Sequence, residues 1–142
     1  VLVDYAHNGP ALESLLKALR EYEPARLIAV FGCGGNRDRN RRFEMGKAAA
    51  QLADFSVVTS DNPRHENPMD IIKDITQAMA QEEGSYIVIP DRREAICWTV
   101  LQAQTGDVIV VAGKGHETYQ LLGSEKRHFD DRETILSVME KI

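Results

Sequence analysis

The stretch Arg26-Leu27-Ile28-Ala29-Val30-Phe31 predicts the fold of this chain. Its unbroken apolar run is typical of a strand that is buried on both faces, as the central strands of parallel sheets are. Gly32-Cys33-Gly34-Gly35 follows at once and ends the strand. Four more apolar runs predict strands of the same kind, at residues 1–5, 55–60, 86–89 and 107–112.

Amphipathic helices are expected between these strands. Leu12, Leu15, Leu16 and Leu19 recur at helical spacing, and Asn8-Gly9-Pro10 before them supplies a cap and a first-turn proline. Apolar strands that alternate with such helices predict one α/β domain over residues 1–142, a three-layer α/β/α, Rossmann-like fold. We expect a mostly parallel sheet of about six strands. Further helices are expected at residues 41–53, from 67, at 91–104 and from 130, with a small hairpin at 119–129.

Composition excludes several classes of protein. The chain has 142 residues, of which 43% are hydrophobic and 27% charged, and a net charge of -5. This acidic balance argues against binding to nucleic acid or a membrane surface. Cys33 and Cys97 have no metal-ligand spacing and cannot form a disulfide framework, so we expect reduced thiols in a cytoplasmic protein. The chain begins at Val1 without a methionine, which favours a piece of a longer protein.

The chemically unusual residues all follow the ends of predicted strands. In parallel α/β sheets, ligands bind beyond the carboxyl ends of the strands. We therefore expect one binding site at a single edge of the sheet, formed by four loops: Asp4-Tyr5-Ala6-His7, Gly32 to Arg39, Asp61 to Arg64, and Gly113 to Glu117.

The loop Asp61-Asn62-Pro63-Arg64 predicts a receptor for a small zwitterion. Arg64 offers a rigid fork of donors that suits a carboxylate. Pro63 restricts the backbone, and Asn62 can both donate and accept hydrogen bonds.

The other three loops each have a plainer alternative. Gly32-Cys33-Gly34-Gly35 with Arg37 could cradle an anion through backbone N–H groups, or could be an ordinary strand-to-helix turn. Gly113 to Glu117 could bring backbone close to a ligand and offer Glu117 to an ammonium group, or could be a tight turn with solvated Lys114 and His116. Asp4 and His7 suit a ribose hydroxyl or a phosphate, or are a cap and an exposed histidine.

Several residues are interpreted as structural. Asp91-Arg92-Arg93-Glu94 is expected to be a helix cap with a solvated face, Trp98 a core residue, and His65 and His128 surface residues. A dinucleotide-binding loop is excluded, because Arg37 stands where the last glycine of its fingerprint belongs. The phosphate-loop frame is absent as well.

Taken in order, the motifs resemble one family, the C-terminal domain of the Mur ligases, and within it the meso-diaminopimelate-adding branch. The resemblance covers nearly the whole chain and rests on Asp-Tyr-Ala-His, Gly-Cys-Gly-Gly-Asn-Arg-Asp, Asp-Asn-Pro-Arg and Gly-Lys-Gly-His-Glu. It implies that an N-terminal domain and a central ATPase domain lie outside this chain. It also implies a ligase that uses ATP and Mg²⁺ to activate a carboxylate of UDP-MurNAc-L-Ala-D-Glu, which the amine of diaminopimelate then attacks.

The resemblance assigns roles to individual residues. Asp4 and His7 match positions that contact ATP when the domains close. No catalytic residue and no metal ligand is implied on this chain, so the isolated domain is expected to be inactive. One departure is Asn8-Gly9-Pro10, where the family usually has Thr-Pro-Asp. The residues implied to bind meso-diaminopimelate are Arg37, Asp61, Asn62, Pro63, Arg64, Gly113 and Glu117, with Asn62 and Glu117 taking its distal ammonium group.

Two alternatives remain open. A ligase of the lysine-adding branch is disfavoured by Arg64, because lysine has no distal carboxylate for it to bind. A stand-alone domain that binds an anionic metabolite without catalysis stays possible on sequence grounds, because this chain alone has no phosphate loop.

Overall fold

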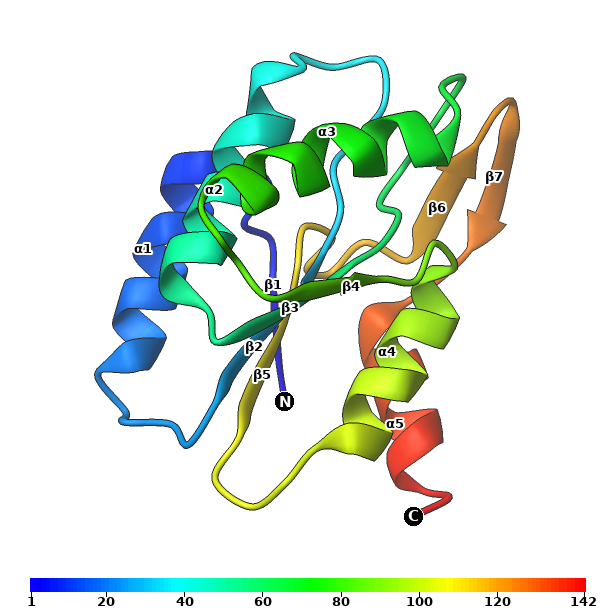
Figure 1. Ribbon diagram of the computed structural model, residues 1–142. Coiled ribbons are helices and arrows are strands. Elements are labelled where there is room, and N and C mark those ends of the chain that lie inside the picture. The colour runs from blue at the N-terminus through cyan, green and yellow to red at the C-terminus, as the bar shows by residue number, and fades with distance from the viewer.

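A computed structural model describes all 142 residues. Its centre is a five-stranded sheet in the order β1-β5-β2-β3-β4, in which every neighbouring pair is parallel (Figure 1). The strands are β1 (Leu2–Asp4), β2 (Leu27–Phe31), β3 (Phe55–Val58), β4 (Tyr86–Val88) and β5 (Val108–Ala112). All five residues of β2 are buried, which confirms that this run lies at the centre of the sheet.

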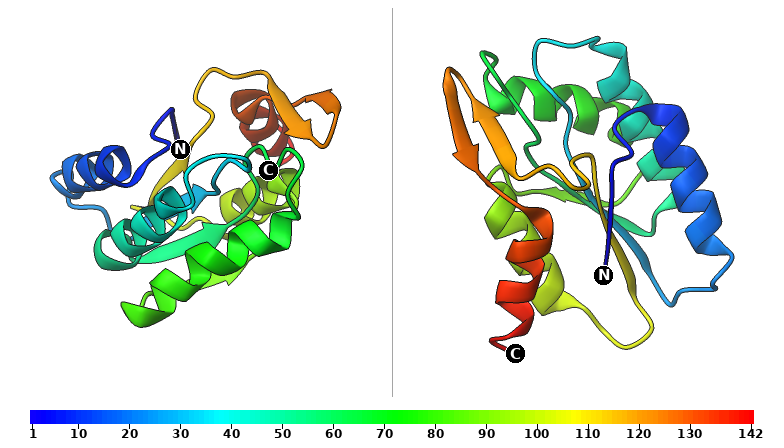
Figure 2. Two further views of the ribbon diagram at one scale, coloured as in Figure 1. Left: turned by 90° about the horizontal axis from the view of Figure 1, so that it is seen from above. Right: turned by 180° about the vertical axis from the view of Figure 1, so that it is seen from behind.

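Helices cover both faces of the sheet, as Figure 2 shows from above. One face packs against α1 (Gly9–Arg20), α2 (Asn40–Leu52) and α3 (Pro68–Gln81) through a cluster of 17 buried apolar residues. The other face packs against α4 (Arg92–Gln102) and α5 (Asp131–Met139) through a cluster of 10. The predicted three-layer α/β/α fold is therefore confirmed.

The predicted helix starts are confirmed by their caps. The side chain of Asn8 accepts a hydrogen bond from the Ala11 N–H at 2.9 Å, and that of Asp91 accepts one from the Glu94 N–H at 3.0 Å. Asp130 accepts two, from the N–H groups of the second and third residues of its helix. These side chains satisfy backbone donors that the first helical turn leaves unpaired.

The expected sixth strand of the sheet is absent. β6 (Tyr119–Leu122) and β7 (Glu125–His128) form a separate antiparallel hairpin, as the sequence predicted, but neither strand joins the main sheet. Every residue of β7 is exposed, because Glu-Lys-Arg-His provides no apolar face to bury. The hairpin instead contacts the loop after β3, where Arg64 and Leu122 form an isolated parallel bridge.

Two structural expectations on α4 are wrong. Arg92 was expected on a solvated face, but it is 1% exposed and paired with Asp131. Trp98 was expected in the core, but it is 37% exposed and packs one side of its ring near Phe55, with 6.2 Å between the ring centroids. His65 and His128 are exposed as predicted. No helix has the length and apolar character needed to cross a bilayer.

Candidate functional site

A cavity of about 290 Å³ lies at the carboxyl edge of the sheet. It brings together residues from all four loops that the sequence singled out. Asp4 and Pro63 do not line it, although His7 does. Its lining residues are Tyr5, His7, Cys33, Gly34, Arg37, Arg41, Asp61, Asn62, Arg64, Gly113, Glu117 and Tyr119.

Glycines allow two of these loops to pack backbone against backbone. A Cβ on Gly35 would lie 2.0 Å from the Pro63 carbonyl oxygen, and one on Gly32 would lie 2.2 Å from that of Thr59. The Gly35 N–H donates to the Asn62 carbonyl at 2.7 Å, and the Asn36 N–H donates to Glu66. These two N–H groups already have partners within the protein. They are therefore not available to bind an anion in the cradle predicted for this loop.

Arg64 is held at the rim of the cavity. Its φ of 53° lies in the left-handed region, which is uncommon for a residue other than glycine. Its backbone is fixed by the hairpin, since the Arg64 N–H donates to the Leu121 carbonyl at 3.0 Å. Nη1 donates to the Gly35 carbonyl at 2.9 Å, whereas Nε and Nη2 have no protein partner. The guanidinium is thus anchored on one side and retains donors for a ligand.

Asp61 provides an acceptor in the same cavity. Its side chain is buried, and Oδ1 has no hydrogen-bond partner in the protein. Burial raises the pKa of this carboxyl group, while the positive charges of Arg92 and Lys114 oppose that rise. Gly113 packs beside it with φ of 114°, and an added Cβ there would lie 3.2 Å from Asp61 Oδ2. Oδ1 lies 3.8 Å from Lys114 Nζ, and a buried carboxylate that accepts no hydrogen bond at this oxygen is suited to an ammonium ligand.

The side-chain oxygen of Asn62 is already occupied. Oδ1 accepts hydrogen bonds from the Leu121 N–H at 3.0 Å and from Lys114 Nζ at 3.3 Å. The expectation that Asn62 would take an ammonium group is therefore wrong for this oxygen. Its Nδ2 has no protein partner and is not fully enclosed, so Asn62 offers the cavity a donor.

Lys114 and Tyr119 are parts of the site that sequence reasoning missed. Lys114 is fully buried, so the alternative of a solvated lysine in a tight turn is wrong. The Tyr119 hydroxyl donates to Glu117 at 3.3 Å. This hydrogen bond orients the Glu117 carboxylate, which was predicted to bind an ammonium group. A lysine between two glycines directly after a buried strand was the available signal for Lys114, but burial of a lysine is rare and cannot be inferred from spacing alone.

The two residues predicted to contact a nucleotide lie on either side of Tyr5. Asp4 Oδ1 accepts from the Ala6 N–H at 2.8 Å, and Oδ2 has no protein partner. His7 Nδ1 lies 3.0 Å from the Tyr5 carbonyl oxygen, which leaves Nε2 available. The Tyr5 ring lies 4.7 Å from that of His7 and 5.9 Å from that of His116. His7 lines the cavity just described, and Asp4 lines a shallower neighbouring one.

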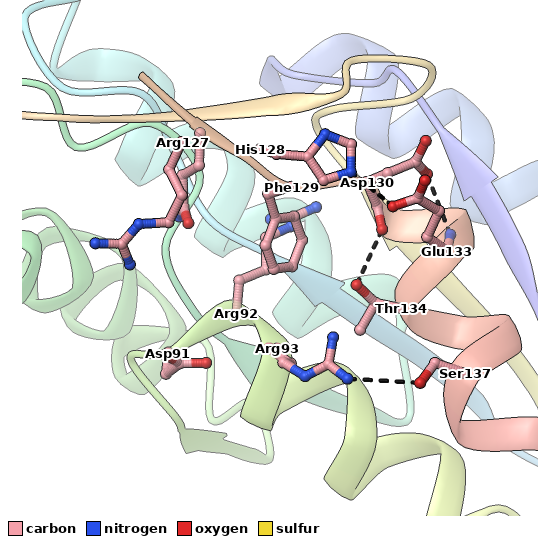
Figure 3. A pocket seen from close by; sticks show the side chains of 11 residues that line it. Asp91, Arg92, Arg93, Arg127, His128, Phe129, Asp130, Glu133, Thr134 and Ser137 are labelled. Carbon is pink, nitrogen blue, oxygen red and sulfur yellow. Dashed lines mark hydrogen bonds and ion pairs between the residues drawn. The ribbon is translucent and has the colours of Figure 1, made fainter. Parts of the chain in front are cut away.

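A second cavity, of about 420 Å³, lies between α4, α5 and the hairpin (Figure 3). Several of its polar groups are paired with one another. His128 Nε2 lies 2.7 Å from Glu133 Oε2, and Arg93 reaches Ser137 at 3.5 Å. None of the predicted ligand-binding residues lines this cavity, although it is the larger of the two. Nowhere in the chain do three or more His, Cys, Asp or Glu side chains gather closely enough to hold a metal ion.

The chain is similar in sequence and in fold to known proteins. A family model described as "Mur ligase, glutamate ligase domain" matches residues 1–115. The UDP-N-acetylmuramoyl-L-alanyl-D-glutamate--2,6-diaminopimelate ligase of Thermosynechococcus vestitus is 57% identical over 133 residues, which cover 94% of this chain and 27% of that protein. Ligase 1 of the same name from Clostridium acetobutylicum is 49% identical over 142 residues, which cover 29% of that protein.

A solved structure of a ligase of that name has the same architecture. It superimposes with a TM-score of 0.92 at 45% identity and covers 98% of this chain, but only 28% of the solved chain is matched. The chain therefore spans a little over a quarter of the length of these relatives.

Proposed function

The chain belongs to the Mur ligase family, and on that premise we propose that residues 1–142 form the single C-terminal domain of an ATP-dependent amide ligase. The ligase would add meso-diaminopimelate to UDP-MurNAc-L-Ala-D-Glu in peptidoglycan synthesis, in the cytoplasm. The N-terminal and central ATPase domains would belong to the rest of the same polypeptide. The observation that carries the proposal is the cavity in which Arg64 donors without a protein partner lie beside the buried carboxylate of Asp61, whose Oδ1 accepts no hydrogen bond.

This pairing of donors and acceptors suits the distal end of diaminopimelate. That end carries both a carboxylate and an ammonium group, whereas lysine carries the ammonium alone. Arg64 and the Asn62 amide would bind the carboxylate, with Arg37 at the exposed rim, and Asp61 and Glu117 would bind the ammonium. Gly113 and Pro63 would shape the cavity through the backbone. With lysine, the donors of Arg64 would remain unpaired, and such a site can reject the analogue by about 10⁴-fold.

The contribution of this domain to the reaction would be binding and orientation. ATP would supply the phosphoryl group that converts the substrate carboxylate to an acyl phosphate. The lone pair of the diaminopimelate amine would then attack the acyl carbon, the C–O bond to phosphate would break, and the amine would lose a proton. The domain would hold this amine at attack distance, which replaces a bimolecular encounter by a pre-oriented one.

The residues of this chain fit only part of the nucleotide site. Asp4 Oδ2 and His7 Nε2 have no protein partners, so both could contact ATP when the domains close. We assign no catalytic residue and no Mg²⁺ ligand to this chain. Mg²⁺ would be held by the rest of the protein, so the domain alone would be inactive.

The test is an amide-ligase assay on the whole protein that contains this chain. Phosphate release is measured with UDP-MurNAc-L-Ala-D-Glu, ATP and Mg²⁺, and with either meso-diaminopimelate or lysine as acceptor. The proposal predicts turnover with diaminopimelate and a kcat/KM for lysine lower by at least about 10³-fold. Preferential use of lysine would assign the chain to the lysine-adding alternative, and binding without turnover would favour the non-catalytic one.

A further inference from the structure

Lys114 is the one lysine whose side chain is completely buried. It lies beneath the cavity, directly after β5, and it does not line the space where a ligand would bind. Burial lowers the pKa of its ammonium group, and the charges of Asp61 and Glu117 oppose that change. A buried charge of this kind persists only when hydrogen bonds and opposite charges compensate for the lost water.

The surroundings of Lys114 supply that compensation from the binding residues themselves. Nζ donates to the Tyr119 carbonyl and to Asn62 Oδ1, the latter at 3.3 Å. It also lies 3.6 Å from Glu117 Oε1 and 3.8 Å from Asp61 Oδ1. Every one of these partners belongs to a residue that lines the cavity.

The contact with Asn62 fixes which end of its amide faces the ligand. The ammonium of Lys114 and the Leu121 N–H are both donors, so the atom between them must be the oxygen. The NH₂ group is then left for the cavity. If the donor from Lys114 were removed, only the Leu121 N–H would hold the Asn62 oxygen in this position.

We propose that Lys114 is a positioning residue that makes the amino-acid cavity selective for a zwitterion. It does so by turning the Asn62 NH₂ group toward the ligand carboxylate and by acting as counter-ion to Asp61 and Glu117. The inference rests on the proposed function, since it concerns the same site. Without Lys114, Asp61 and Glu117 lose the positive charge that lies within 4 Å of both, and the Asn62 amide loses one of the two donors that orient it. The cavity then favours a bare ammonium over an ammonium beside a carboxylate.

The test compares variants of the whole protein by the ratio of kcat/KM for meso-diaminopimelate to that for lysine. Lys114→Met keeps an unbranched side chain one atom shorter and removes the donors and the charge. We expect the ratio to fall at least tenfold, with the KM for ATP within about twofold of the wild type. Lys73→Met, at an exposed lysine of α3, is the matched control and leaves the ratio unchanged. An unchanged ratio in a folded Lys114→Met protein would overturn the proposal.

Asn62→Asp tests the proposal if the Lys114→Met protein does not fold. Asn62→Asp keeps an oxygen for Lys114 and Leu121 but replaces the NH₂ group by a second oxygen. We expect at least a tenfold fall in the same ratio, and an unchanged ratio would also overturn the proposal. In the double variant Lys114→Met/Asn62→Ala, the loss should be smaller than the sum of the losses in the two single variants, because part of the effect of Lys114 acts through the Asn62 amide. Additive losses would contradict action through Asn62.

A crystal structure of the Lys114→Met variant separates this inference from the proposed function. A wild-type protein that uses neither amino acid would refute the proposed ligase, whatever Lys114 does. The position of the Asn62 amide is independent of that result. We expect it to rotate or to adopt more than one position in the variant, and retention of the wild-type position would refute the role of Lys114.

Discussion

Arg92 and Asp131 form an ion pair in which both side chains are fully buried. Nε lies 2.8 Å from Oδ1 and Nη2 lies 2.8 Å from Oδ2, so the pair is bidentate. Arg92 also donates to the carbonyls of Ser60 at 3.1 Å and Ala112 at 3.2 Å. It therefore joins α4 and α5 to the residues that immediately precede Asp61 and Gly113.

Arg92→Met is expected to lower the free energy of unfolding by about 3–5 kcal/mol, because it leaves Asp131 as an unpaired buried charge. Urea unfolding measures the change. The neighbouring exposed Arg93 provides the matched control, since Arg93→Met should change stability by less than about 0.5 kcal/mol. Equal effects of the two substitutions would contradict the role given to the buried pair.

Gly35→Ala is expected to disturb the binding site through the backbone. The new Cβ would lie 2.0 Å from the Pro63 carbonyl oxygen, so the loop that carries Arg64 must move. We expect a KM for diaminopimelate raised at least tenfold and a stability loss of about 1–3 kcal/mol. Gly84→Ala is a control for overpacking, because its Cβ would lie 2.6 Å from Ala50 Cβ, away from the cavity. It should lower stability without changing KM, and a similar KM for both variants would refute the argument.

Cys33 is expected to resist alkylation in the folded protein. Burial raises the pKa of its thiol to about 12, and Sγ lies 3.3 Å from the Met45 sulfur. Because the thiolate is the reactive form, iodoacetamide at pH 8 should modify Cys33 only after unfolding in urea. Peptide mass spectrometry measures the modification. Comparable labelling of Cys33 in folded and unfolded protein would contradict this assignment.

His128 should make stability depend on pH. Its hydrogen bond to Glu133, together with the charge of that carboxylate, raises the pKa of His128 above its usual 6.5. The folded state thus binds the proton more tightly. The stabilisation is fully present below the unfolded-state pKa and is lost as the pH rises through the folded-state pKa. Urea unfolding between pH 5.5 and 8.5 measures how the free energy of unfolding falls as the pH rises. His128→Gln should remove a small part of that fall.

The control for this pH effect is His65→Gln. His65 is also exposed but forms no ion pair, so its replacement controls for the loss of an exposed imidazole. A His128→Gln profile parallel to that of the wild type would show that the pair with Glu133 contributes nothing.

Much of the fold could be predicted because its signals are local. The apolar run of β2 is continuous in sequence. The caps at Asn8 and Asp91 each bond a backbone N–H three residues further along the chain. The gathering of the loops at one cavity follows from a general property of parallel sheets, that their carboxyl ends meet at one edge. Seven of the predicted residues line this cavity for that reason.

What could not be predicted depends on partners distant in sequence. The burial of Arg92 requires Asp131, which lies 39 positions away, and that of Lys114 requires Asn62, 52 positions away. No local pattern distinguishes these charged residues from solvated ones. The orientation of the Asn62 amide likewise depends on the docked hairpin, through Leu121, 59 positions away.

The most direct test of the binding site is thermal unfolding of the whole protein with meso-diaminopimelate, with lysine and without ligand. A ligand that binds only the folded state adds RT ln(1 + [L]/Kd) to its stability, so affinity near 1 mM is detectable at about 10 mM ligand. We predict that diaminopimelate raises the Tm, that lysine does not, and that Arg64→Ala abolishes the difference. In a further sample with ATP, the shift caused by ATP should remain in Arg64→Ala. Equal shifts with both amino acids, or an undiminished response to diaminopimelate in Arg64→Ala, would contradict recognition of the distal carboxylate by this domain.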